Sequence, residues 1–290
     1  MPASDASVAQ YNARIRVLRT ALGVEEGDLK FLNRPKSVIQ VIENMKDASV
    51  NTRKAFYIAI VATLKTLKRG PTKALETYRA KQLEYNNAVS EQYNKQELSP
   101  SEVEKFVSWT DILAVREKMK EATAFNTYSK MYQDYVLVCL YTYLPPARLD
   151  YGALKIVDKL PEKLTDNYYV TGTPEIVLSQ YKTVNKYGVH HIKIPNELAQ
   201  ILDKFIQILP EPVNYLLMNS NNELMSEASL SKNLTRIFMK YTGKKVSVNI
   251  LRHSYVTHHM AGQKTKKELD EFASGMMHST AMDVIYRKLT

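Results

Sequence analysis

The sequence predicts a mainly α-helical protein with one small β-sheet, an α+β fold divided between two domains. Up to residue 98, apolar residues recur at helical spacing between short links. A polar stretch at 94–101 then places Pro100 and Ser101 ahead of a new helix start, which is typical of a linker. Beyond it, helical segments alternate with short runs of strand-forming residues. A chain of 290 residues is long enough for two domains, and we expect them at 1–98 and 99–290.

The first domain is expected to be a bundle of four helices, because each segment has a recognisable start or stop signal. Gly23 ends the first helix and Pro35 opens the second. Asn51 and Thr52 are suited to cap the third. The expected helices are 9–22, one that starts at 35, 51–69 and 72–92.

The second domain is expected to combine helices with four short strands. Pro145 and Pro146 end one helix firmly, because proline lacks an amide hydrogen and clashes with the preceding turn. The tip between the last two strands, 181–188, is polar and turn-like. The expected strands are 154–157, 168–170, 176–180 and 189–194. The expected helices are 110–121, 126–143, 195–209, 226–241, 247–260, 266–276 and a short one that carries Tyr286.

The composition limits the class of protein. The one cysteine, Cys139, excludes a disulfide framework and a cysteine-based zinc site, and its apolar neighbours favour a buried, inert thiol. The longest apolar run, 55–64, is too short to span a bilayer, so we expect no membrane association. His253, His258 and His259 lack the four-residue spacing that aligns metal ligands on a helix, so no metal is expected.

The net charge of +10 favours a polyanionic partner. Of the 40 basic and 30 acidic residues, 16 and 10 precede Pro100, so the smaller first domain carries +6. Nucleic acid is the expected polyanion, because affinity for it depends largely on neutralising phosphates. A basic protein with a solvated surface is the alternative.

The last forty residues contain the main candidates for chemistry. Arg252 and His253 are followed by His278 and then by Tyr286. A tyrosine hydroxyl can attack a phosphodiester if cationic groups hold the phosphate and another group protonates the leaving oxygen. Arginine suits a phosphate well, because its planar guanidinium matches two oxygens and stays charged. Arg252 lies near the start of a helix that Ser247 can cap, where the backbone amides add to this attraction.

Two further candidates lie upstream. Arg148 directly follows the double-proline turn, and turns position functional groups better than solvated helix faces do. A surface ion pair with Asp150 is the alternative for this arginine. Lys182 and Lys186 lie on the polar tip between two strands, and either could contact DNA.

Together these residues resemble the tyrosine recombinases, the integrase group that includes phage and mobile-element enzymes. The family's catalytic set is an arginine, a hairpin lysine, a histidine or lysine three before a second arginine, that arginine, a histidine or tryptophan, and a tyrosine. Five of these six positions are filled in the expected order, by Arg148, Lys182, Arg252, His278 and Tyr286. The matching segments are Ala147-Arg148-Leu149-Asp150, Tyr181-Lys182-Thr183, Leu251-Arg252-His253-Ser254, His278-Ser279 and Tyr286.

The chain departs from the family pattern at the sixth position. Asn249 stands three residues before Arg252, and an amide can bind a phosphate but cannot carry a proton. The proton of Tyr286 would then pass to water, to the phosphate or to a neighbour such as His253. On a helix, His253 faces about 100° away from Arg252, so a packing role is its alternative. In the family an acidic residue usually follows the first arginine by three positions, whereas Asp150 follows Arg148 by two. The interval from His278 to Tyr286 is one residue shorter than the family pattern.

The resemblance implies a DNA strand-exchange enzyme that needs no cofactor. Tyr286 would form a 3′-phosphotyrosine, which retains the bond energy for rejoining. Arg148, Arg252 and His278 would bind the phosphate, and Lys182 would protonate the leaving 5′ oxygen. The family also implies a helical core-binding domain and a catalytic domain that clamp double-stranded DNA, with a homotetramer assembled on it. The first domain matches the family only in architecture.

A basic edge in the first domain is expected to contact DNA. Lys65, Lys68, Arg69 and Lys73 follow one another at three- to four-residue spacing around a helix end. A solvated helix face is the alternative. The expected location is intracellular, at DNA in a nucleus or nucleoid, and the context is a mobile element or viral genome integration.

Two other functions are compatible with the sequence. A type IB topoisomerase or a hairpin-forming resolvase would use the same chemistry without strand exchange between sites. A DNA-binding protein with weakened catalysis is the third reading, and Asn249 is the residue that permits it.

Overall fold

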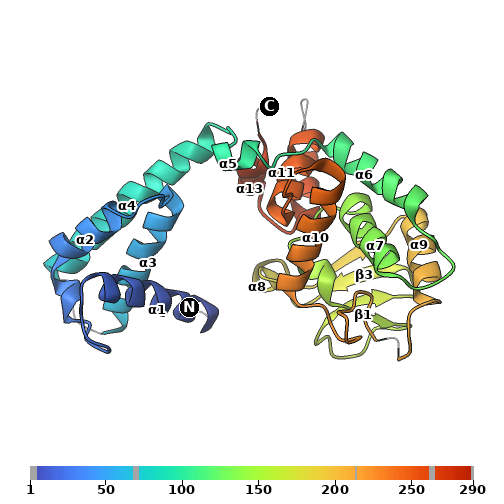
Figure 1. Cartoon of the computed structure of the whole chain (residues 1–290), viewed down its shortest axis with the longest axis horizontal. Helices are drawn as coiled ribbons and strands as arrows, with labels where there is room; N and C mark the ends of the chain where they lie inside the picture. Colours follow the sequence, from blue (N-terminus) through green and yellow to red (C-terminus); the bar gives the residue numbers. More distant parts are fainter. Residues whose placement is uncertain (1–4, 68–71, 213, 261–264, 289–290) are drawn as a thin grey trace. The chain divides into compact units, whose positions relative to one another are not determined.

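The computed structural model describes residues 5–67, 72–212, 214–260 and 265–288 (Figure 1). The chain divides into two compact units, residues 1–95 and 96–290. The boundary expected after residue 98 falls in the short segment between α4 (Lys73–Asn94) and α5 (Pro100–Val103). The mainly helical class with one small sheet is confirmed.

Within its described residues, the first unit consists of helices. Helix α3 packs against both α1 and α4, and its buried residues supply much of the unit's apolar core. The third helix begins at Val50, because the Ser49 side chain accepts a hydrogen bond from the Thr52 amide at 3.1 Å. The expectation that Asn51 or Thr52 caps this helix was therefore wrong. The elements are α1 (Asp5–Ala21), the 3₁₀ turn η1 (Lys30–Asn33), α2 (Pro35–Glu43), α3 (Val50–Thr66) and α4.

A carboxylate joins three helices of the first unit. Glu43, at the end of α2, accepts hydrogen bonds from the hydroxyls of Tyr57 on α3 at 2.7 Å and Tyr85 on α4 at 2.5 Å. Burial acts to raise the pKa of Glu43, but these two hydrogen bonds and the charge of Lys81 outweigh it and lower that pKa. The ionised carboxylate therefore stabilises the bundle.

The second unit surrounds a four-stranded sheet with helices. The sheet order is β1-β2-β3-β4, with β1 parallel to β2 and the other neighbours antiparallel. The strands are β1 (Leu154–Val157), β2 (Asn167–Val170), β3 (Glu175–Leu178) and β4 (His190–Lys193). The other elements are α6 (Trp109–Ala122), α7 (Lys130–Tyr143), η2 (Asp150–Ala153), α8 (Val184–Tyr187), α9 (Asn196–Ile206), α10 (Glu227–Thr242), α11 (Val248–His259), α12 (Lys266–Gly275) and α13 (Thr280–Tyr286).

Hydroxyl caps determine where several of these helices start. The side chains of Ser108, Ser129, Ser226 and Ser247 each accept a hydrogen bond from an amide in the first turn that follows. Helix α7 consequently starts at Lys130 instead of the expected residue 126. The expected turn at 181–188 contains one helical turn, α8, between β3 and β4.

Helix α7 forms the centre of the second unit's core. Eleven of its residues, from Tyr132 to Thr142, are buried, and Figure 1 shows the helix between α10, α9 and the sheet. Cys139 is fully buried there, and burial raises the pKa of its thiol to about 12. The inert thiol that the sequence predicts fits this environment.

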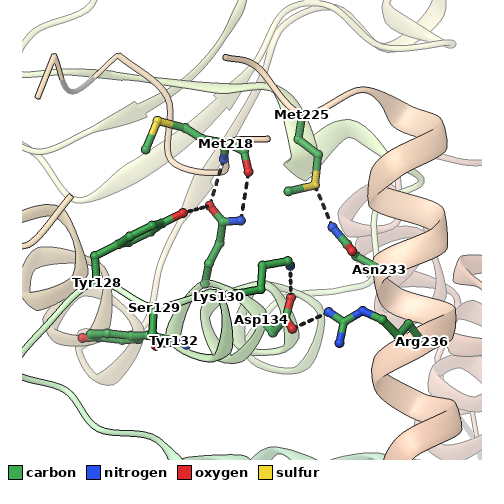
Figure 2. A network of polar contacts seen from close by, with 10 residues as sticks. Tyr128, Ser129, Lys130, Tyr132, Asp134, Met218, Met225, Asn233 and Arg236 are labelled. Carbon is green, nitrogen blue, oxygen red and sulfur yellow. Dashed lines mark hydrogen bonds and ion pairs between the residues drawn. The ribbon is translucent and has the colours of Figure 1, made fainter. Parts of the chain in front are cut away.

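Polar contacts hold α7 against α10 and the segment before it (Figure 2). Asp134 is buried and pairs with both Lys130 and Arg236. Gln133 exchanges two hydrogen bonds of 2.9 Å with the backbone of Met218. These contacts fix the orientation of α7, and with it the double-proline turn that follows its last residue.

Candidate functional site

Arg252 is fully buried at the centre of the candidate site. Ser247 caps α11, so Arg252 lies in the second turn of that helix. Its guanidinium donates through Nη1 to the Pro146 carbonyl, and through Nη2 to the Met276 carbonyl at 3.4 Å and His278 Nδ1 at 3.0 Å. Its Nε finds no partner among the described residues. One side chain therefore joins the double-proline turn, the end of α12 and the start of α13.

The electrostatics around Arg252 favour an anion. In the described part of the chain its hydrogen-bond partners are carbonyls and a neutral imidazole, and no carboxylate pairs with it. The face of the Tyr286 ring lies 4.7 Å from its guanidinium carbon, a cation–π contact. A buried cation without an ion-pair partner is costly, so the charge of this site favours an anion.

His278 is positioned by an unusual helix end. Helix α12 closes with a Schellman pair, in which the amides of Met277 and His278 donate to Ser274 and Ala273. Met277 takes the left-handed conformation, with φ of 53°, where glycine is usual. Its side chain is buried in the main core, and this burial offsets the backbone strain.

Both ring nitrogens of His278 are engaged. Nε2 lies 2.6 Å from Oδ1 of Asp283, and Nδ1 lies 3.0 Å from Nη2 of Arg252. Because a carboxylate only accepts and a guanidinium only donates, Nε2 carries the hydrogen and Nδ1 holds the lone pair. The second oxygen of Asp283 is buried without a hydrogen-bond partner in the described ranges.

Tyr286 lies at the end of α13 between two histidines. Its ring stacks on His278, with centroids 5.4 Å apart and planes 20° apart, and meets the His253 ring edge-on at 5.0 Å. The His253 Nδ1–H donates to the Tyr286 carbonyl at 2.8 Å. Tyr286 is 8% exposed, so α13 holds the tyrosine closed over Arg252.

Arg148 follows the double-proline turn and is partly buried. Tyr141 and Tyr151 hold this turn through hydrogen bonds to the carbonyls of Arg148 at 2.5 Å and Pro145 at 2.9 Å. Burial raises the pKa of the Asp150 carboxyl, while the charges of Arg148 and then Arg252 act to lower it. Both guanidinium groups therefore lie within electrostatic range of one carboxyl.

Lys182 lies in the connection between β3 and α8, and its side chain is exposed. The adjacent Thr183 donates through Oγ1 to the Met277 carbonyl at 3.3 Å, directly before His278. The hydroxyl of Tyr181 donates to the Gly188 carbonyl at 2.7 Å and closes the connection. The connection 179–183, which we call the lysine loop, is therefore attached to the backbone directly before His278.

Asn167 connects the lysine loop to the segment 145–150, which carries Arg148. Its Oδ1 accepts from the amides of Ser179 and Gln180 at 2.9 and 2.8 Å, and its Nδ2 donates to the Gln180 carbonyl at 2.9 Å. The same Nδ2 lies 3.5 Å from the Asp150 carbonyl. Asn167 is 3% exposed, so this buried amide connects the segments that carry Lys182 and Arg148.

The two suggested helper residues lie in different environments. Asn249 is exposed in the first turn of α11, one turn before Arg252. His253 is buried, with Nε2 3.4 Å from Oε1 of Glu102. Burial lowers the pKa of His253, against its hydrogen bond to the Tyr286 carbonyl, which raises it. His253 thus anchors the backbone of the tyrosine.

The expected DNA-contacting residues are exposed where the structure describes them. Lys65 lies in the last turn of α3 and Lys73 in the first turn of α4. Lys68 and Arg69 lie outside the described residues. Lys186 is exposed on α8, with its ammonium 4.9 Å from the centroid of the Tyr187 ring.

Sequence reasoning missed two residues that hold the site together, Asp283 and Asn167. Asp283 pairs with His278, five residues earlier, and this spacing matches neither the i,i+3 nor the i,i+4 pair that a helix brings together, so the sequence carried no clear signal for it. Asn167 gave no signal, since its partners are backbone groups 12 to 17 residues away.

Two kinds of feature are absent from the described residues. No helix among them combines the length and apolar character that crossing a membrane requires. No group of three histidine, cysteine, aspartate or glutamate residues there could hold a metal ion.

Comparisons with known proteins identify the fold. No family model and no curated protein sequence matches the chain. The Tn1549 transposon integrase in complex with transposon right end DNA is 15% identical with a TM-score of 0.63, covering 99% of this chain and 90% of that chain. A lambda integrase dimer bound to a COC′ core site is 13% identical with a TM-score of 0.61, covering 99% of this chain and 73% of that chain.

A second lambda integrase structure, comprising residues 75–356 of that protein, is 12% identical with a TM-score of 0.61 and covers 99% of this chain and 89% of that chain. The chain therefore has the fold of these integrases over nearly its whole length. The resemblance to the tyrosine recombinases is confirmed at the level of the fold.

Proposed function

We propose that the protein is a site-specific DNA recombinase or integrase that cleaves and rejoins DNA through a 3′-phosphotyrosine intermediate. The observation that carries this proposal is the convergence of Arg252, His278 and Tyr286 at one point. Arg252 bonds to His278 and lies against the ring of Tyr286. A nucleophile, a cationic phosphate ligand and a hydrogen-bonding imidazole are the groups that phosphodiester cleavage without a metal requires.

The segments that carry Arg148 and Lys182 are connected to this site by hydrogen bonds to backbone carbonyls. Arg252 binds the Pro146 carbonyl, two residues before Arg148. The lysine loop is attached next to His278 through Thr183. In the proposed roles, Arg148 and Arg252 hold the phosphate, Lys182 protonates the leaving 5′ oxygen, and Tyr286 attacks.

The closed position of Tyr286 has a consequence for binding. Arg252 is fully buried beneath α13 and the segment before it. A phosphate reaches this guanidinium only after α13 moves. We therefore propose that DNA displaces α13 and that the tyrosine returns in line with the phosphorus.

The proposed partner is double-stranded DNA, with a homotetramer for strand exchange. The solved structures of similar fold are described as complexes with transposon end DNA and with a core site. Lys65 and Lys73, with Lys68 and Arg69, would contact phosphates from the first unit, and Lys186 from the second. The proposed setting is intracellular, at the DNA of a mobile element.

The test traps the covalent intermediate. In a pool of nicked duplexes with a randomised central segment, attack near the nick releases a short fragment with a free 5′ hydroxyl, so rejoining fails and the protein stays attached to the 3′-phosphate. Adducts that survive denaturant are expected with the wild type and absent with Tyr286→Phe. Tyr241→Phe, a tyrosine on α10, is the matched control and is expected to form adducts at the wild-type rate. Adducts formed equally by Tyr286→Phe would overturn the assignment.

A DNA-binding protein with weakened catalysis is the second candidate. The exposed amide of Asn249, one turn before Arg252, favours it because an amide cannot accept a proton. Sequence-selective DNA binding without any adduct from the pool is its expected result. Relaxation of supercoiled plasmid without a preferred site would instead indicate a topoisomerase.

A further inference from the structure

Asp283 and His278 form the most buried carboxylate–imidazole pair in the described part of the chain. Nε2 and Oδ1 are 2.6 Å apart, and both side chains are 2% exposed. By contrast, the pair of His191 with Glu175 is largely exposed. A short contact to a charged acceptor at a dry position is strong. Asp283 therefore fixes the tautomer and the orientation of the His278 ring.

This orientation points the Nδ1 lone pair of His278 toward the proposed phosphate site. Nδ1 accepts from Nη2 of Arg252, the guanidinium that is expected to bind phosphate. When a phosphate oxygen has taken that hydrogen bond and α13 has returned with Asp283 and Tyr286, Nδ1 is available beside the ring of Tyr286. The charged or titratable groups that the structure brings against His278 are then Arg252 from α11 and Asp283 and Tyr286 from α13.

The hydroxyl of Tyr286 needs a proton acceptor, and the two helper side chains that the sequence suggested are unsuitable. Asn249 cannot take a proton. His253 donates its Nδ1 hydrogen to the Tyr286 carbonyl and directs Nε2 toward Glu102. Among these neighbours, His278 alone has a nitrogen that phosphate binding would free.

We propose that His278, positioned by Asp283, accepts the proton of Tyr286, an assignment that rests on the proposed function. The O–H bond of Tyr286 breaks and an N–H bond forms at Nδ1. The phenolate oxygen bonds to phosphorus, and the bond from phosphorus to the 5′ oxygen breaks. The leaving oxygen takes a proton from Lys182. The imidazolium then lies between the phosphate and the Asp283 carboxylate, which stabilises it, and rejoining reverses each step.

A spectroscopic experiment on DNA-free protein tests the pair independently of catalysis. The full chain is labelled with ¹⁵N-histidine, and His278→Gln identifies the His278 signals among those of the six histidines. We expect a hydrogen on Nε2, with a strongly downfield proton resonance that Asp283→Asn abolishes. A hydrogen on Nδ1 instead, or an Nε2 signal unchanged in Asp283→Asn, would overturn the positioning role.

Kinetics test the proton transfer, using a sequence recovered from the nicked pool. Asp283→Asn is expected to lower the single-turnover rate of adduct formation by about 10²-fold, the low end for general acid–base catalysis. The acidic limb of the rate–pH profile is expected to move to lower pH, because the imidazolium loses its carboxylate. Asp270→Asn, an exposed aspartate on α12, makes the same charge change and is expected to leave rate and profile unchanged.

Three outcomes decide the matter. A slower Asp283→Asn whose profile keeps its wild-type limb indicates a structural role and overturns the proposal. Asp283→Glu keeps the carboxylate, so a reduced rate with the wild-type acidic limb supports the proposal. This variant also keeps the test decisive if Asp283→Asn fails to fold. If the wild type forms no adduct at all, the proposed function fails, while the spectrum of His278 still supports or overturns the pair.

Discussion

Arg252 is the residue on which the site depends. Its charge is fully buried, and in the described ranges it contacts carbonyls, an imidazole and an aromatic face, with no carboxylate. Removing an ion of this size from water costs several kcal/mol even after relaxation. An apolar residue would pack there at lower cost, so the buried guanidinium fits the phosphate-binding role that we propose for it.

Lys182 gives the sharpest prediction for a single side chain. Lys182→Ala is expected to slow cleavage by about 10²–10⁴-fold, the usual contribution of a general acid. Replacing the bridging 5′ oxygen with sulfur is expected to restore the rate, because a thiolate leaves without being protonated. Lys186→Ala, the exposed lysine on α8, serves as the control and keeps the wild-type ratio of rates on the two substrates. Equal losses on oxygen and sulfur substrates would exclude Lys182 as the acid.

The sequence predicted candidate catalytic residues more readily than the residues that position them. Arg148, Lys182, Arg252, His278 and Tyr286 have reactive groups in a recognisable order. Their supports are backbone carbonyls, a left-handed methionine and a buried amide, which depend on tertiary contacts. The starts of α3 and α7 were predicted at the wrong residues because their capping serines were not recognised. Ser49 and Ser129 cap these helices, which begin one and four residues away from the expected starts.

At the scale of elements, Asn167 connects the loops on which Arg148 and Lys182 lie. Asn167→Asp keeps the acceptor but loses the donor to Gln180, so the lysine loop is expected to loosen. Cleavage of the oxygen substrate is expected to fall roughly 10-fold, with recovery on the sulfur substrate as for Lys182→Ala. Asn185→Asp on α8 is the control. A loss of the same size on both substrates would mean that Asn167 acts only on stability.

The stability of the helical bundle in the first unit is predicted to depend on pH through Glu43. Its pKa in the folded chain is lowered, so its stabilising effect is present above the ordinary value of 4.5 and disappears as the pH falls through the folded pKa. Glu43→Gln is expected to lower the free energy of opening of α2–α4 by about 1–2 kcal/mol at pH 7. At pH well below 4.5 the difference should vanish, as measured by hydrogen exchange on the full chain. A difference independent of pH would contradict this account.

At the scale of the whole molecule, both units are expected to contribute to DNA affinity. The first carries a larger share of the net charge than its length would give. If Lys65 and Lys73 contact phosphates, Lys65→Ala/Lys73→Ala is expected to reduce the slope of log affinity against log salt by about 2. Fluorescence anisotropy with a labelled duplex measures this slope. Lys30→Ala/Lys36→Ala removes the same charge from exposed positions, and an equal change there would indicate only a general field.

The attachment of DNA to Tyr286 tests the central claim most directly. The adduct from the nicked pool is digested with protease and nuclease, and mass spectrometry identifies the peptide that carries the nucleotide. We predict a peptide with Tyr286 joined to a 3′-phosphate, with a free 5′ hydroxyl on the released strand. Linkage through another of the nineteen tyrosines, or to a 5′-phosphate, would contradict the account.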